Sequence, residues 1–462
     1  MIRTLFAMTV ALAAATLPAQ ATEIQRVVSP GGIEAWLVEE HAIPVVATAF
    51  AFRGGASQDP AGKAGLASMM SSLLDEGAGD LDAAAFQERL EETAVELSFR
   101  AERDQFSGTM RTLAENMDEG FRLLGLALTA PRFEQEAVDR IRAQVSARLR
   151  RDARDPGDIA GRAFMATAFP DHPYGLPVRG TVDTLAAITR EDLAAAARRQ
   201  LARDNLVIGV VGAIDAKTLG EKLDATFGPL PAKSELVAVA DTAAKLPGAP
   251  RVVELPVPQT TIILGRPGPL RKDDDFIPAF VLNHILGGGS FSSRLFTEVR
   301  EKRGLAYSVY SYLAPYRHTG LLMGGVATRN DRAGETLGII REEVRRMATD
   351  GPTDEELAKA KQFLIGSFAL RFDTSTKIAD QLVSLQVDDL GIDYINKRNG
   401  LIAAVTKDDI KRAASKLLAD GDLLVVAVGQ PTGFDGAARI TVPATAAAMG
   451  QRPEVPAART AQ

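Results

Sequence analysis

The chain of 462 residues contains no cysteine, and it has only four histidines. The absence of cysteine excludes disulfides, thiol nucleophiles, thiolate metal sites and a lipid-modified cysteine. No two histidines have the i, i+4 spacing that places a pair of imidazoles on one helical face for zinc. We therefore interpret each histidine as a surface or packing residue. They are His41, His172, His284 and His318.

Charge of one sign and long apolar runs are also scarce. The chain has 53 Lys and Arg against 59 Asp and Glu, a net charge of −6, and no long run of one sign. A nucleic-acid binder normally presents a basic face, so nucleic acid is not expected as a partner. Beyond residue 17 no stretch reaches the ~18 uncharged apolar residues of a transmembrane helix, so no membrane span is predicted. Nucleophile-elbow and P-loop motifs are missing as well.

The first segment has the pattern of an export signal. A positive start at Arg3 precedes an uncharged apolar run of 13 residues, Leu5 to Leu17. The small-x-small pattern of residues 19–21 then matches a signal-peptidase site. We expect residues 1–21 to be removed. A cysteine-free exported chain fits an oxidising compartment, which favours a periplasmic location.

The chain contains an internal repeat. Residues 185–212 align without a gap with residues 402–429, with 11 identities in 28 positions. Each copy has a threonine followed three residues later by an aspartate, which is typical of a helix N-cap with an acidic first turn. An amphipathic helix and a short apolar strand are predicted to follow in both copies.

The repeat indicates two duplicated domains of about 210 residues each. Strand-like patterns that follow one another directly suggest hairpins, so we expect an α+β fold in which each domain has a mixed β-sheet with helices packed on one face. Between the copies lies an Ala-, Lys-, Asp- and Pro-rich stretch typical of a linker. The predicted bounds are 22–231 for the N-terminal domain, 232–249 for the linker, 250–443 for the C-terminal domain and 444–462 for a disordered tail.

Several segments together form a recognisable pattern. They are RGGAS at 53–57, GLA at 65–67, DEG at 75–77, HPYGLP at 172–177, LGGGS at 286–290 and REKRGLAY at 300–307. This set resembles the pitrilysin/insulinase-type zinc peptidases over essentially the whole mature chain, including the duplication. The closest pattern is that of the short-chain branch, which includes the mitochondrial processing peptidases. The resemblance implies the processing-peptidase (metallohydrolase-like) fold, with two chains of two domains closing around a peptide.

The zinc motif of that family is lost here. Catalytic members carry H-x-x-E-H on the helix that follows the GLA segment, and the three functional positions fall on Ser68, Ser71 and Ser72. The third ligand of the family, a glutamate of a later helix, falls on Arg148. Neutral hydroxyls are poor zinc ligands, and an arginine repels the cation. The sequence therefore predicts no metal and no cofactor in this chain.

The resemblance implies that Arg300 and Tyr307 form an Arg/Tyr pair that reaches substrate at the zinc of a catalytic domain. A guanidinium can donate to a peptide carbonyl, and a phenol can donate to a developing oxyanion. Without the resemblance, Arg300 is interpreted as a surface charge near a helix C-terminus and Tyr307 as a strand-packing residue. The run Gly287, Gly288 and Gly289 is interpreted as a flexible turn between helices, or as a phosphate cradle, and as a candidate loop for touching peptide.

We therefore predict a non-catalytic, substrate-binding subunit of a heterodimeric periplasmic zinc endopeptidase. A partner chain with H-x-x-E-H would hold the zinc, peptide would be the substrate, and this chain would be inactive alone. The alternative is a scaffold protein of an envelope complex that keeps the peptidase fold without proteolysis. Retention of both Arg300 and Tyr307 argues against that alternative. An active single-chain peptidase would need ligands that the sequence does not show.

Overall fold

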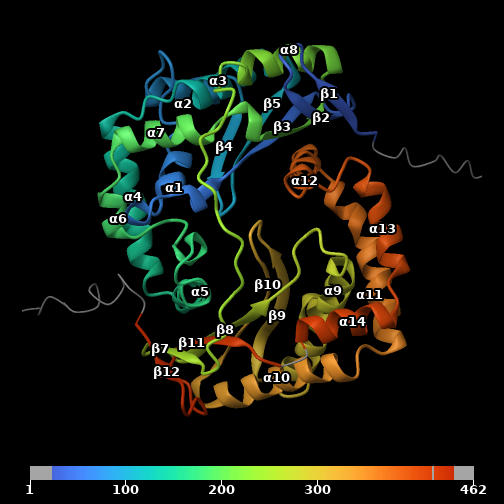
Figure 1. Ribbon diagram of the computed structural model, residues 1–462. Coiled ribbons are helices and arrows are strands. Elements are labelled where there is room, and N and C mark those ends of the chain that lie inside the picture. Colours follow the sequence, from blue (N-terminus) through green and yellow to red (C-terminus); the bar gives the residue numbers. More distant parts are fainter. Residues whose placement is uncertain (1–22, 419–420, 442–462) are drawn as a thin grey trace, which may run out of the picture.

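The computed structural model describes residues 23–418 and 421–441 (Figure 1). Two six-stranded sheets form its framework, one from each copy of the repeat. The predicted export signal at 1–21 and the predicted tail at 444–462 lie outside the described residues.

The first sheet has the order β1-β2-β6-β3-β5-β4. Only β2 and β6 run parallel; the other neighbours are antiparallel. Seven consecutive residues of β3 are buried because both faces of this strand are covered. The strands are β1 (Gln25–Val28), β2 (Glu34–Glu39), β3 (Val45–Arg53), β4 (Glu96–Ala101), β5 (Gln105–Leu113) and β6 (Leu206–Gly212).

The second sheet repeats this arrangement in the order β12-β7-β11-β8-β10-β9. Only the outermost strand differs, because β1 precedes its neighbour in the chain and runs antiparallel to it, whereas β12 comes last and runs parallel. The strands are β7 (Arg251–Glu254), β8 (Gln259–Pro267), β9 (Ala306–Pro315), β10 (Gly320–Arg329), β11 (Leu424–Gly429) and β12 (Ala438–Arg439). The predicted α+β class with two mixed sheets is confirmed.

Six helices follow the same order in both copies of the described chain, and the first copy has two more, α2 and α8. The first copy has α1 (Leu66–Ser71), α2 (Ala83–Glu92), α3 (Met117–Thr129), α4 (Gln135–Asp152), α5 (Pro156–Ala168), α6 (Val182–Ala186), α7 (Arg190–Gln200) and α8 (Ala216–Phe227). The second has α9 (Phe276–Asn283), α10 (Ala333–Thr349), α11 (Asp354–Gly366), α12 (Ser375–Val387), α13 (Tyr394–Ala404) and α14 (Lys407–Leu418). None of these helices combines the length and apolar character needed to cross a bilayer.

The predicted repeat segment forms α7–β6 and α14–β11. The threonine before each helix and the aspartate three residues on bond to each other: Thr189 and Thr406 donate their backbone N–H to Asp192 and Asp409, each at 2.8 Å. Such reciprocal caps satisfy amide groups that a helix N-terminus leaves unpaired.

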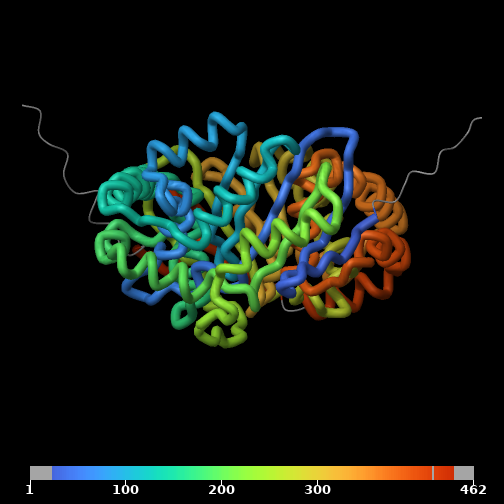
Figure 2. The backbone as a smooth tube through the Cα atoms, turned by 90° about the horizontal axis from the view of Figure 1, so that it is seen from above, coloured from blue at the N-terminus to red at the C-terminus, as the bar shows by residue number. Residues whose placement is uncertain are grey.

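The two halves exchange one helix each, which the repeat alone did not indicate. Helix α5 packs on β8 and β11 of the second sheet, and α12 packs on β3 and β6 of the first (Figure 1). A Cβ on Gly209 of β6 would lie 2.7 Å from the Ala379 carbonyl oxygen, so only glycine permits this close approach. Viewed from above, second-copy helices accordingly lie beside the N-terminal strands (Figure 2).

The HPYG loop joins the two halves. The Tyr174 hydroxyl donates to Asp104 between β4 and β5 at 2.6 Å, and it accepts from the His318 amide between β9 and β10 at 3.1 Å. The amide of Arg317 donates to the same aspartate at 3.0 Å. This buried tyrosine therefore ties together the tips of one hairpin from each sheet.

Candidate functional site

The start of α1 is built around a buried carboxylate. Asp59 accepts the backbone N–H groups of Gly65 at 2.9 Å and Ala67 at 3.0 Å. Burial raises the pKa of Asp59 to about 7, although these amide bonds and Arg199 oppose the rise. Gly65 has φ 96, and a Cβ there would meet the Arg179 carbonyl at 2.9 Å. The GLA segment thus requires glycine for a left-handed turn into the helix.

Two of the three serines at α1 use their hydroxyls within the same turn. Ser71 and Ser72 donate to the Ser68 carbonyl oxygen at 2.8 Å and 3.2 Å. Bonds of this kind compete with the helical ladder. The α-helix ends at Ser71, after six residues. The hydroxyls are therefore turned toward a backbone acceptor.

Arg148 lies on the solvent side of α4. Its Nε is 3.8 Å from the Asp152 carboxylate one turn along, and its side chain is exposed. Neutral hydroxyls engaged with a carbonyl and an exposed guanidinium do not fit Zn²⁺, which needs His, carboxylate or thiolate donors. Within residues 23–418 and 421–441, no three His, Cys, Asp or Glu side chains are grouped so as to hold a metal.

The structure brings Arg300 and Tyr307 together. Arg300 is on η8 (Phe296–Glu301), which is a π-helical turn. Such turns are rare in proteins, and those that occur are often found at functional sites. Its guanidinium carbon lies 4.6 Å from the Tyr307 ring centroid, 4.7 Å from Phe296 and 5.7 Å from Phe291. Tyr307, at the start of β9, is 82% exposed. In the described part of the chain no carboxylate pairs with Arg300, so this partly exposed cation packs against aromatic rings and keeps free donors.

The three glycines do not form a flexible turn. Gly287 and Gly288 end η6 (His284–Gly288), a π-helical turn that continues α9. Gly287 is buried, and a Cβ there would lie 2.5 Å from the Ser311 Oγ of β9; one on Gly288 would lie 2.6 Å from the Asn283 Nδ2. Gly289 follows, partly exposed. Close packing against β9 thus requires glycine at Gly287, and because Gly287 and Gly288 belong to a helical turn, the interpretation as a flexible turn is corrected.

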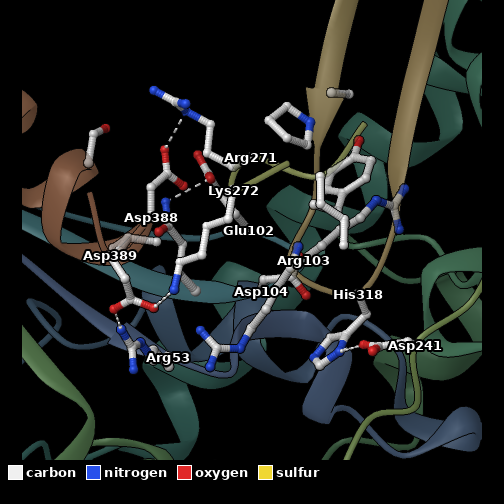
Figure 3. A pocket seen from close by; sticks show the side chains of 18 residues that line it. Arg53, Glu102, Arg103, Asp104, Asp241, Arg271, Lys272, His318, Asp388 and Asp389 are labelled. Carbon is white, nitrogen blue, oxygen red and sulfur yellow. Dashed lines mark hydrogen bonds and ion pairs between the residues drawn. The ribbon is translucent and has the colours of Figure 1, made fainter. Parts of the chain in front are cut away.

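A cavity of about 580 Å³ lies between the two halves, and sequence reasoning missed it (Figure 3). Charges of both signs line it in pairs: Asp389 meets Arg53 at 2.5 Å and Lys272 at 3.0 Å, and His318 meets Asp241 at 2.9 Å. Arg53 belongs to the RGGAS segment, but its partner lies 336 positions away in sequence. No local pattern indicates such a pairing.

Comparison with known proteins identifies the relatives of this chain. Residues 187–364 match the family model described as "Peptidase M16 inactive domain". An uncharacterized zinc protease of Streptomyces coelicolor is 34% identical over 307 residues, which cover 63% of this chain and 64% of the relative. The non-peptidase homolog YmxG of Helicobacter pylori is 27% identical over 73% of this chain and 78% of its own length.

Solved structures agree with these relatives. The crystal structure of a peptidase M16 inactive domain from Pseudomonas fluorescens superposes with a TM-score of 0.83 at 27% identity, covering 91% of this chain and all of that one. The resemblance to pitrilysin/insulinase-type peptidases is thereby confirmed. The chain is a homologue of the pitrilysin-like M16 metallopeptidases, and the family model that it matches is the one described as their inactive domain.

Proposed function

We propose that this chain is the non-catalytic, substrate-binding subunit of a two-chain zinc endopeptidase of the periplasm. The partner subunit would carry H-x-x-E-H and the zinc, and the substrate would be an unfolded or short peptide. The proposal rests above all on one observation, the packing of the partly exposed Arg300 against the exposed ring of Tyr307.

The pair has the chemistry that peptide hydrolysis requires from a second subunit. Arg300 is held by three aromatic rings and keeps guanidinium N–H groups free to bind a backbone carbonyl of the substrate. Tyr307 presents its hydroxyl to solvent, where it can donate to the oxygen on which negative charge develops. Neither role needs a metal in this chain.

The charged cavity supports a peptide ligand. Its walls pair Arg53 and Lys272 with Asp389, and His318 with Asp241 (Figure 3). A peptide has backbone donors and acceptors and side chains of both signs. Its groups can therefore replace one partner of each ion pair, so that no charge in the cavity is left without a partner. Because the cavity lies between the halves, a peptide bound there would contact both copies of the fold.

The test combines the purified mature chain with an H-x-x-E-H partner and follows cleavage of a quenched fluorescent peptide with and without a chelator. We expect chelator-sensitive cleavage only in the mixture. Tyr307→Phe should lower kcat about 100-fold or more, the size typical of a lost oxyanion donor, with KM little changed. Tyr310→Phe, on the same strand and also exposed, is the matched control and should keep wild-type kcat.

Other results would redirect the assignment. If Tyr307→Phe raised KM while kcat held, the hydroxyl would bind substrate without stabilising an oxyanion. Cleavage by this chain alone would overturn the alignment of Ser68, Ser71, Ser72 and Arg148 with the zinc positions. No cleavage with any H-x-x-E-H partner would favour the scaffold role.

A further inference from the structure

A second cavity, of about 470 Å³, lies within the second half, between α9, β9 and helices α11 to α13. By element order, α9 and α11 are the counterparts of α1 and α4. The cavity therefore occupies the place in the second copy that corresponds to the lost zinc positions of the first. Its volume suits a small ligand. Much of its wall is apolar and includes Phe280, Leu364, Phe368, Leu385 and Ile395.

The cavity contains a buried arginine without a counter-ion. Arg398 is only 7% exposed, and its guanidinium carbon lies 4.1 Å from the Phe368 ring centroid. Its Nη1 donates to the Leu364 carbonyl oxygen and to Asn399 Oδ1, both at 3.0 Å. No carboxylate of the described chain pairs with it. A buried charge is costly unless an opposite charge accompanies it, so this one is suited to an anion that comes from outside.

The surrounding charges favour an anion as well. The wall has three arginines, Arg271, Arg371 and Arg398, against one carboxylate, Asp388. Arg271 pairs with Asp388 at 3.4 Å, which leaves the positive charges of Arg371 and Arg398 uncompensated. Burial, and then repulsion by Arg371, lower the pKa of Arg398 to about 10. A bound anion would stabilise the charged form of Arg398 and so offset both the burial and the repulsion.

We propose that this cavity binds a carboxylate joined to an apolar chain. The carboxylate would accept hydrogen bonds from Arg398, with Arg371 near the opening, in the planar geometry that guanidinium groups favour. The apolar chain would lie among Phe280, Phe368 and Leu385. Two sources share this chemistry: a free fatty acid and the C-terminal residue of a peptide that ends in an apolar side chain. The site needs neither the partner subunit nor zinc, so it stands apart from the proposed function.

Calorimetry on the purified mature chain tests the proposal. The probes are decanoate, decanol, and an N-acetylated pentapeptide ending in leucine as free acid or as amide. We expect the acid forms to bind at least tenfold more tightly than decanol and the amide. Binding of decanoate alone would identify free fatty acids as the ligand, and binding of the acid peptide alone would identify peptide C-termini.

Variants then tie the binding to the two arginines. Arg398→Met should weaken binding of the acid probe at least tenfold, and Arg371→Met several-fold. Arg345→Met is the control, since Arg345 is exposed on α10 and pairs with Glu342, and it should change nothing. If Arg398→Met does not fold, Arg371→Met decides. Binding of decanol as tight as that of decanoate, no binding of either acid, or affinity unchanged in the arginine variants would overturn the proposal.

Discussion

The same pair of strands has opposite surface chemistry in the two halves. In the first half, exposed residues of β4 and β5 form polar cross-strand pairs: Ser98 meets Thr109 at 2.8 Å, and Arg111 donates to Glu96 at 3.1 Å. In the second half, the equivalent ladder on β9 and β10 presents Tyr310, 47% exposed, and Tyr312, 43% exposed. Such exposed aromatic side chains are typical of binding surfaces.

The contrast shows how one duplicated fold divided its tasks. The first half keeps a polar strand pair that water can solvate. The second half keeps Arg300 among aromatic rings, a tyrosine face, and a cavity with an uncompensated arginine. The binding chemistry that we propose is therefore concentrated in the second copy, while both copies retain the same framework.

The largest expected loss of unfolding free energy concerns the exchanged helices, α5 and α12, since each covers strands of the other half's sheet. Phe164 of α5 is fully buried against the second sheet. Phe164→Ala should cost about 3–5 kcal/mol of unfolding free energy, because a cavity replaces the ring. Hydrogen exchange should then show lost protection in β8 and β11, although the substituted residue belongs to the first copy. Leu370→Ala, at a side chain 72% exposed, should change the unfolding free energy by less than about 0.5 kcal/mol.

Protection of β8 and β11 that survives Phe164→Ala would mean that α5 does not support the second sheet.

The next expected effect is a pH dependence of the unfolding free energy that has opposite signs for one carboxyl group in each half. Asp59 before α1 has a pKa of about 7 in the fold, above its unfolded value of 3.8, so the folded state holds an extra proton between these values. The free energy of unfolding should therefore fall by about 1.4 kcal/mol per pH unit from pH 5 to about 7 and level off above. Asp59→Asn should remove this slope, as measured by urea unfolding at each pH.

Asp275 before α9, the counterpart helix, provides the opposite case. Hydrogen bonds from Lys416 and Arg412 hold its pKa below the ordinary value. The ionised Asp275 therefore stabilises the folded state above pH 3.8, and this stabilisation is lost as the pH falls through the lower pKa of the folded state. Asp275→Asn should thus reduce stability at pH 7 and not at acid pH. If the unfolding free energy changed with pH in the same way in Asp59→Asn and Asp275→Asn, the opposite pKa shifts given to these two carboxyl groups would be wrong.

The sequence predicted those features that depend on neighbours in the chain. The repeat of residues 185–212 at 402–429 recovered two helix–strand units with their caps. The family resemblance of REKRGLAY, and not its spacing alone, implied the pair of Arg300 and Tyr307 that the structure brings together. The exchange of α5 and α12 was not predictable, because a helix with an apolar face carries no mark of which sheet it will cover. The two cavities were not predicted either, because the residues that line them come from elements far apart in the sequence.

A moderate effect is expected at the junction between the halves. Tyr174→Phe removes the hydroxyl that donates to Asp104 and accepts from the His318 amide, while the ring stays in place. Because two polar groups lose a buried partner, the loss should be about 1–3 kcal/mol of unfolding free energy. Measurement by thermal and urea unfolding should show a lower midpoint in Tyr174→Phe. Tyr316→Phe, which keeps the aromatic contact beside Tyr174, is the control and should remain near wild type. An equal loss in both variants would assign the effect to ring packing.

The smallest expected effect tests the contrast between the strand pairs directly. Tyr310→Ser gives the second half the side chain that Ser98 gives the first at the equivalent place on β4, and it exposes Gly325, over which the ring of Tyr310 lies. Binding of a fluorescent unfolded peptide, followed by anisotropy, should weaken about 3- to 10-fold, since one aromatic contact contributes about 0.5–1.5 kcal/mol. Thr109→Ala, at the polar ladder, should leave the affinity unchanged. If the two substitutions weakened binding equally, peptide would lie across both sheets, and the difference in surface chemistry would not select between them.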